Sequence, residues 1–573
     1  MAIRTAKAVV EEVPSAAQSS VASLAACREN NSERDTGRVA KRFGLKLPIP
    51  LSRVQLGSDE IPFLKMSDWA TFILQAHLWH RLCGLTDRDQ QRCCDIWQSF
   101  WTRYQKIEPN HPIYKRPGHD LSRTCALLLH GDEGRSLRKS ALMVISTHSI
   151  LGFGLSTSKH EKKSKRLAQK LNYEQPTWTT RFLLSVLPKS YYSEEDDAAL
   201  DSDPFQDLMD AICIDLRSLY DNGIETKDGR FYFCVVKVMG DWPFIQKCGS
   251  LSRTFMNISK AASSRAPPKG ICHLCCADMT GVEWENFHIR PPTWVPTVNT
   301  LSAFLTLPKV LQLPMEESFR ENFFCFDLFH AWHLGAGKTF LASCLAVLAI
   351  SSAYQGSVES RLEKLNAEYI QWKKATGFTC QLRRINRAKL GWSATTVFPA
   401  GTWSKGSTTT CLMRFFLAMC QKHGEHVNGD LLLRFAFGAA KQMDCFLHGL
   451  YSWELWIPSN AAKEIAVSGA NFLKLHGKAV QIAHSQGQLF FLLMPNFHRI
   501  DHLVWDMETQ AAKTNFVLNP LYCATQSDED FIGRPSRLSR RVSPRLTIQR
   551  TLERSLVAAY AQYVEIGALV LKA

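Results

Sequence analysis

The stretch that decides the fold is Phe231-Tyr-Phe-Cys-Val-Val-Lys-Val-Met-Gly-Asp241-Trp-Pro243. Its β-branched and aromatic residues are typical of a buried β-strand, and Pro243 marks a point where such a strand has ended. The strand therefore delivers the carboxylate of Asp241 from its carboxyl end. Carboxylate oxygens are ligands for hard divalent cations, so a metal site requires that the fold bring other acidic side chains close to Asp241.

The segments around this stretch predict the order strand, strand, strand, helix, strand. Strands are expected at 125–130, 141–147, 181–187 and 231–240, and an amphipathic helix is expected at 205–220. Residues 131–134 are expected to form a turn directly after the first strand. This is the order in which the α/β ribonuclease H-like fold begins, and in that fold the first strand lies beside the strand that follows the helix.

Asp132 and Asp241 would then be neighbours on adjacent strands. Two such carboxylates can hold a pair of Mg²⁺ ions, which activate water and stabilise the leaving oxygen at a phosphodiester. The alternative is a pair of unrelated turn residues, because Gly-Asp is common in turns. The order of the elements favours the metal site.

The composition points to a polyanionic partner. The chain has 573 residues, a formal net charge of +15 and 45% hydrophobic residues, so it can bury a large core and attract nucleic acid. Its 18 cysteines follow no repeating frame, which favours reduced thiols inside the cell. No signal peptide is expected, and the longest apolar run, 340–350, is shorter than the roughly 20 residues that span a bilayer.

Cys272 and Cys275 form a C-x-x-C pair, which has the right spacing for two thiolate ligands of tetrahedral zinc. Asp327 and His330 are the candidates for the second half of this zinc knuckle, with His333 or His288 as substitutes. Asp327 is equally a candidate magnesium ligand.

A nucleotide-binding loop is an alternative reading of Gly335-Ala-Gly-Lys338-Thr, because it follows an apolar run and precedes a predicted helix. Trp332 stands where the motif requires its first glycine, so a P-loop centred on Lys338 is the weaker hypothesis.

The second half of the chain is predicted to be mainly helical, with a basic patch at Arg383, Arg384, Arg387 and Lys389 that either tracks a phosphate backbone or is simply solvated. His498 and His502 share a helical face, a spacing that suits a metal, although core histidines are the commoner explanation. Asp528-Glu-Asp530 then precedes a row of arginines. Those expected to contact nucleic acid are Arg534, Arg537, Arg540 and Arg541.

Taken in order, these motifs resemble the DDE transposases of the CACTA (En/Spm-like) superfamily. The matching segments are Asp132 after the first strand, Phe182-Leu-Leu-Ser-Val-Leu-Pro188, Gly240-Asp-Trp-Pro243, Cys272/Cys275, Asp327/His330 and Asp528-Glu-Asp-Phe-Ile-Gly533. The chain also resembles a divergent, multicopy family of protist proteins of mobile-element origin. It departs from the superfamily in having Gly-Asp-Glu-Gly around Asp132 and Asp530 where an arginine is usual.

The resemblance implies Mg²⁺- or Mn²⁺-dependent DNA cleavage and strand transfer in the nucleus, with DNA as the partner, no membrane, and self-association possible. Asp132, Asp241 and Glu529 would be the catalytic metal ligands, with Asp528 or Asp530 as alternatives for the third acid, and Zn²⁺ would be structural. A decayed or domesticated copy, which binds nucleic acid without chemistry, is the alternative.

The expected organisation has six parts. These are a disordered tail (1–45), a helical region (46–118), the first part of the ribonuclease H-like core (119–245), a zinc-knuckle region (246–340), a mainly helical insertion (341–510) and a catalytic, basic helical segment (511–573).

Overall fold

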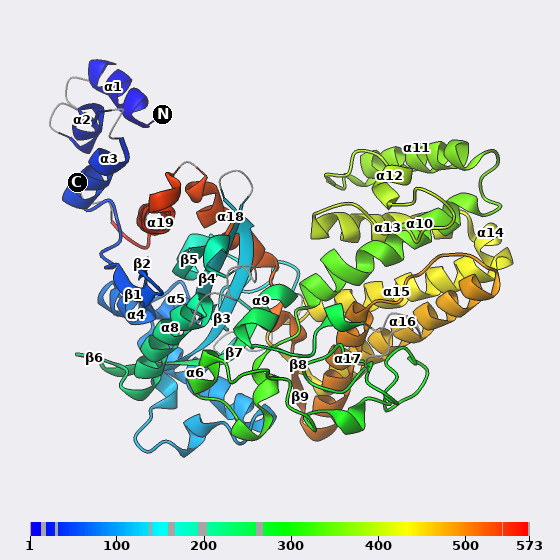
Figure 1. The fold of residues 1–573 in the computed structure, drawn as a ribbon, viewed down its shortest axis with the longest axis horizontal. Coiled ribbons are helices and arrows are strands. Elements are labelled where there is room, and N and C mark those ends of the chain that lie inside the picture. The colour runs from blue at the N-terminus through cyan, green and yellow to red at the C-terminus, as the bar shows by residue number, and fades with distance from the viewer. Residues whose placement is uncertain are drawn as a thin grey trace.

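The computed structural model describes residues 2–12, 19–28, 32–136, 140–158, 167–192, 203–258, 268–540 and 542–570. It is a mixed α/β protein in which a five-stranded sheet and a large helical bundle share one continuous core (Figure 1).

The sheet has the strand order β5-β4-β3-β7-β6. Its strands are β3 (Thr124–Arg135), β4 (Ala141–Ser149), β5 (Phe182–Pro188), β6 (Ile224–Thr226) and β7 (Gly229–Gly240). The pairs β3/β4, β4/β5 and β6/β7 are antiparallel, whereas β3 and β7 are parallel. The predicted strands at 141–147, 181–187 and 231–240 are confirmed to within a few residues.

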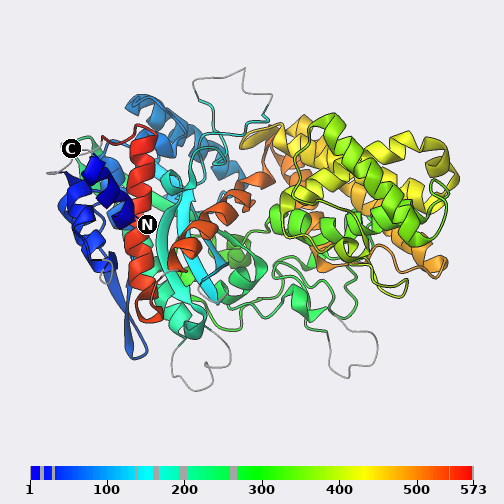
Figure 2. The ribbon, with the colours of Figure 1, turned by 90° about the horizontal axis from the view of Figure 1, so that it is seen from above.

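Helices cover both faces of the sheet, which explains why the central strands are apolar on both sides. Phe231 and Phe233 contact Trp79 on one face, and Cys234 lies close to Tyr220 on the other. Trp79 belongs to α5 (Trp79–Leu82), and Tyr220 belongs to α8 (Pro204–Asp221), the helix predicted at 205–220. Helices α18 (Gln526–Ser539) and α19 (Thr547–Glu565) lie along β3 and β5 (Figure 2).

The helical bundle fills the other half of the molecule (Figure 1). Its helices are α10 (Gly337–Ile350), α11 (Val358–Thr376), α12 (Arg387–Leu390), α13 (Gly406–Lys422), α14 (Gly424–Gly429), α15 (Leu431–Tyr451) and α16 (Ser459–Ser485). Helix α17 (Pro495–Lys513) and the two-stranded sheet of β8 (Trp456–Pro458) and β9 (Phe516–Leu518) connect the bundle to the large sheet.

One helical stretch among the described residues, Phe329–Ile350, is long and apolar enough to cross a membrane. However, 78% of its most apolar window is buried inside the protein, where it packs against α13 and α15. It consists of the π-helix η13 (Phe329–Ala336) followed by α10.

Three expectations need correction. The described parts of residues 1–45 are helical rather than disordered: α1 (Ala2–Glu12), α2 (Ser20–Ala25) and α3 (Ser32–Arg42) enclose a small core around Ile3, Cys27 and Val39. The helical region that follows begins with a hairpin of β1 (Ser52–Leu56) and β2 (Asp59–Phe63), ahead of α4 (Met66–Gln75), α5 and α6 (Gln90–Ile107). Residues 131–134 are not a turn, because β3 continues through them while paired with β4.

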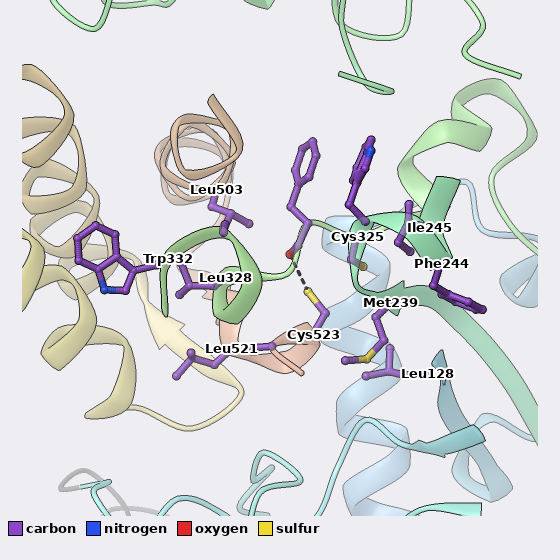
Figure 3. Close-up of a cluster of buried hydrophobic side chains, with 14 of the residues drawn as sticks. Leu128, Met239, Phe244, Ile245, Cys325, Leu328, Trp332, Leu503, Leu521 and Cys523 are labelled. Carbon is purple, nitrogen blue, oxygen red and sulfur yellow. Dashed lines mark hydrogen bonds between the residues drawn. The ribbon is translucent and has the colours of Figure 1, made fainter. Parts of the chain in front are cut away.

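Apolar side chains join the sheet to the bundle (Figure 3). Leu128 and Met239 come from the sheet, Leu328 and Trp332 from the entry to η13 and from η13 itself, and Leu503 from α17; all are buried. In the same cluster the thiol of Cys523 donates to the carbonyl oxygen of Phe326 at 3.5 Å. The segment leading into η13 is therefore fixed against both halves of the molecule.

Candidate functional site

Asp132 and Asp241 follow matched positions on two neighbouring parallel strands. Gly131 of β3 pairs with Gly240 of β7, and an aspartate directly follows each of these two glycines. Both glycines are required because the ring of Phe244 covers the strand ends. A Cβ on Gly131 would lie 2.1 Å from that ring, and one on Gly240 would lie 2.4 Å from the Gly131 carbonyl oxygen.

Asp241 also begins α9 (Trp242–Cys248), where its Oδ1 accepts a hydrogen bond from the Phe244 N–H at 2.9 Å. This capping fixes the carboxylate at the end of the strand. Asp132, at the same edge of the sheet, is only 5% exposed, so its carboxylate is largely shielded from water.

Glu529 reaches Asp132 from the first turn of α18. Ligand atoms of Asp132, His330 and Glu529 lie within 4.8 Å of one another. The chain thus brings together one acid from a strand, one from a helix almost 400 residues later, and a histidine from the segment between them.

His330 is held between two acids. Its Nδ1 lies 2.6 Å from Asp327 Oδ2, and its Nε2 lies 3.2 Å from Glu529 Oε1. Asp327 Oδ1 also accepts hydrogen bonds from the N–H groups of Phe329 at 2.7 Å and Thr525 at 3.2 Å. Asp327 therefore joins the start of η13 to the residue just before α18, and it fixes His330 against Glu529.

The electrostatics of this group follow from its burial. Burial, with the nearby charges of Asp241 and Glu529, raises the pKa of Asp132 well above its usual value. Burial likewise raises the pKa of Asp241 to about 6. Burial alone would lower the pKa of His330, but hydrogen bonds to Asp327 and Glu529 raise it well above its usual value. The site thus gathers several carboxylates, and the nearby cations among the described residues include His330 and Arg499.

The other two acids of the 528–530 run face elsewhere. Asp528, 1% exposed, accepts a hydrogen bond from Arg181 Nε at 3.1 Å and lies 3.3 Å from His148 Nδ1. Asp530 pairs with Arg534 at 2.9 Å on the surface. Of the three, only Glu529 points toward Asp132.

A second group lies nearby and is built from sulfur and nitrogen. Cys272, Cys275, His498 and His502 are all buried, with ligand atoms within 4.8 Å of one another. The sulfur of Cys275 lies 3.3 Å from His498 Nε2 and 3.4 Å from His502 Nε2, and that of Cys272 lies 3.4 Å from His502 Nε2.

This geometry fits a tetrahedral metal. With metal–sulfur bonds of about 2.3 Å and metal–nitrogen bonds of about 2.0 Å, neighbouring ligand atoms lie about 3.5 Å apart. Burial alone would raise the pKa of Cys272, but Cys275, His502 and His498 together lower it well below its usual value, which favours the thiolate that binds metal. This buried Cys₂His₂ group can hold a metal such as zinc.

The predicted partners of the cysteines were therefore wrong. Asp327 and His330 lie with the acids, and among the described residues neither His333 nor His288 belongs to either group. The histidines that the structure places beside the two cysteines lie on α17, more than 220 residues after the C-x-x-C pair. Their spacing of four was the available signal, since it places two imidazoles on one face of a helix.

The remaining sequence candidates do not converge on these groups. Arg534 is paired with Asp530, and Arg537 is exposed on α18. Arg540 caps the end of α18, where its Nε donates to the carbonyl oxygen of Arg135 at 3.1 Å, and Arg541 lies outside the described residues. Lys338 sits in the first turn of α10, which begins at Gly337, and the residues before it form η13, which is kinked at Gly335. These residues therefore do not form the loop that a P-loop requires.

No family profile matches the chain, and no curated protein is significantly similar to it in sequence.

Proposed function

We propose that this chain is a DDE-transposase-like protein whose Asp132, Asp241 and Glu529 hold divalent metal ions for cleavage and transfer of DNA strands. The observation that carries the proposal is the approach of Glu529, from a distant helix, to Asp132, with Asp241 following the matched position on the neighbouring strand. Asp241 is outside the group of ligand atoms that lie within 4.8 Å of one another, but its charge acts on Asp132. DNA as partner, Mg²⁺ or Mn²⁺ as cofactor and the nucleus as compartment are parts of the same proposal.

The sheet supports a ribonuclease H-like core. Three antiparallel strands, a helix and a parallel strand beside the first occur in the expected order. An isolated parallel bridge between Val238 and Phe324 extends the sheet beside the carboxyl-terminal part of β7. In this bridge the Cys325 N–H donates to the Val238 carbonyl oxygen at 2.9 Å. That segment leads directly to Asp327.

The charge of the site supports a bound cation. Three buried or half-buried carboxylates repel one another, and an ion with two positive charges would remove that repulsion. When bound, the ions would supply activation of water or a 3′-hydroxyl and stabilisation of the departing oxygen. His330 and Asp327 would orient Glu529 toward the ion, as partners of metal ligands commonly do.

The Cys₂His₂ group would have a structural role in this protein. All four of its side chains are buried, so no open position faces solvent, in contrast to catalytic zinc sites. A metal there would attach α17 to the loop after α9, next to the acid group.

The test is a cleavage and strand-transfer assay on duplex DNA with Mg²⁺ or Mn²⁺, comparing the wild type with Asp241→Asn. Asparagine retains the helix cap, so this variant should fold while losing a metal ligand. We expect metal-dependent cleavage that Asp241→Asn lowers at least a hundredfold, since even partners of metal ligands are worth about 10–100-fold.

If the wild type binds DNA but shows no metal-dependent cleavage, the catalytic proposal fails. The protein would then be a silent nucleic-acid-binding protein, in which the bonds of His330 to Asp327 and Glu529 merely stabilise the core.

A further inference from the structure

The segments 381–389 and 402–408 of the helical bundle form a basic pocket. It has a volume of about 330 Å³, and its floor includes the buried Trp403, whose Nε1–H donates to Thr409 Oγ1 at 2.8 Å. The floor is therefore fixed in place, and the pocket is part of the packed structure rather than a gap in a loose loop.

The charge of the pocket has one sign. Arg383, Arg384, Lys389 and Lys405 line it with exposed side chains, and none of the described lining residues carries a carboxylate. The nearest acid that contacts them is Glu363, 4.0 Å from Arg384, and both side chains of that pair are more than half exposed. Such an exposed pair is weak, so it leaves the positive potential of the pocket almost intact.

Helix α13 adds to this potential. Its 17 residues begin at Gly406, its cap residue Lys405 makes no side-chain capping bond, and its first turn has no acid. The positive end of the helix dipole therefore faces the same space as the four cations.

One tight contact, between the start of α13 and η13, links the pocket to the acid group. A Cβ on Gly406 would lie 2.6 Å from the ring of Phe329 and 3.1 Å from His333 Cβ, so the start of α13 rests directly on η13. Phe329 is the neighbour of His330, which contacts Glu529. The pocket and the carboxylates are thus separated by a single helical segment.

We propose that this pocket binds a backbone phosphate of duplex DNA, at a point on the duplex away from the cleaved bond. The inference rests on the proposed function and adds to it a second contact, supplied by the helical bundle. Cations on an open rim suit a long polyanion, because a small ligand would be enclosed by its site. The bundle would thereby align the duplex while the sheet domain carries the chemistry.

The test compares two sets of charge-removing substitutions in the full-length protein. One set changes Arg383, Arg384, Lys389 and Lys405 to Gln. The matched set removes the same charge from exposed residues on α15 and α16, at Arg434, Lys441, Lys463 and Lys474. Binding of a labelled duplex of about 30 base pairs is measured by fluorescence anisotropy in EDTA over a range of salt concentrations.

We expect the pocket set to weaken binding about tenfold or more at about 100 mM salt, and to reduce the slope of log K against log salt by about 1 or more. The matched set should change binding by less than about threefold, because its charges act only at long range. Lys405→Glu alone should also weaken binding, and its single surface change guards against misfolding of the larger variant.

Equal losses in the two sets, or no loss in the pocket set, would overturn the pocket while leaving the proposed function intact. A wild type that binds no duplex would overturn both. Single-stranded DNA and RNA of the same length form separate arms, and a loss confined to RNA would show that the pocket does not serve duplex DNA.

Discussion

Asp528, Glu529 and Asp530 face three directions because successive residues of a helix are turned by about 100°. Asp528 is turned into the core toward Arg181, Asp530 is turned to the surface toward Arg534, and Glu529 faces Asp132. The chemistry of a carboxylate is the same at all three positions, so the surroundings of each side chain decide its role.

Glu529→Gln should therefore abolish metal-dependent cleavage, with a loss of at least about a hundredfold, because a neutral amide is a poor ligand for Mg²⁺. Asp530→Asn is the matched control, since it removes an acid from the same helix that is 53% exposed in its side chain. Cleavage rates at saturating metal measure both. A larger loss in Asp530→Asn than in Glu529→Gln would contradict the assignment of the third acid.

The sequence predicted the position of Asp241 well, because a β-branched and aromatic run that stops just before Pro243 strongly favours a strand that ends there. It predicted the surroundings of Asp132 less well. Gly-Asp-Glu-Gly has the composition of a turn, yet pairing with β4 keeps residues 131–134 extended. Local preference was overridden by a neighbouring strand, which a single sequence does not display.

At the scale of elements, β7 is tied to α6 by a buried ion pair. Lys237 Nζ contacts Glu108 Oε1 just beyond the end of α6, and donates to the carbonyl oxygen of Asn322 at 2.7 Å. Lys237 is 7% exposed. A cation in the middle of the central strand is tolerated because both partners are present.

Lys237→Met should lower the free energy of unfolding by about 3 kcal/mol, because Glu108 loses its cation in a site only 17% exposed. The double variant Lys237→Met/Glu108→Leu should recover much of that loss, since no unpaired charge remains. Chemical denaturation measures both. If the double variant is as unstable as the sum of the two single variants, the pair does not act as a unit.

Helix α17 carries the two histidines of the Cys₂His₂ group. The C-x-x-C pair was readable from spacing, whereas its partners were not, because nothing in one sequence shows that 272–275 and 498–502 meet. The mistaken choice of Asp327 and His330 followed from proximity along the chain. Contacts between distant segments depend on how the whole core packs, and the spacing of residues within one short segment carries no information about that packing.

Cys275→Ser should reduce bound zinc from one ion per chain to a small fraction, measured by elemental analysis of the purified protein. It should also lower stability by several kcal/mol, because zinc binding at such sites contributes directly to folding. Cys276→Ser is the control, since Cys276 is adjacent but outside the group. Equal zinc contents in the two variants would show that the group is not a metal site.

At the scale of the whole molecule, one residue joins the two sites. Arg499 lies between the two histidines of α17, is 7% exposed, and stacks over Trp242 at 4.2 Å from the ring centre. Trp242 directly follows Asp241. Helix α17 also packs against η13, which carries His330, so the same helix contacts both the Cys₂His₂ group and the acid group.

Arg499→Met should therefore weaken Mg²⁺ binding about 10–100-fold while the zinc content stays at the wild-type level, because Asp241 loses the support of a packed Trp242. Mg²⁺ affinity is measured from the rise in melting temperature with metal concentration, which depends only on binding to the folded state. Arg290→Lys is the matched control, because Arg290 pairs with Asp501 at 2.6 Å on α17 without touching Trp242. If both variants keep wild-type Mg²⁺ affinity, the two sites are independent despite their shared helix.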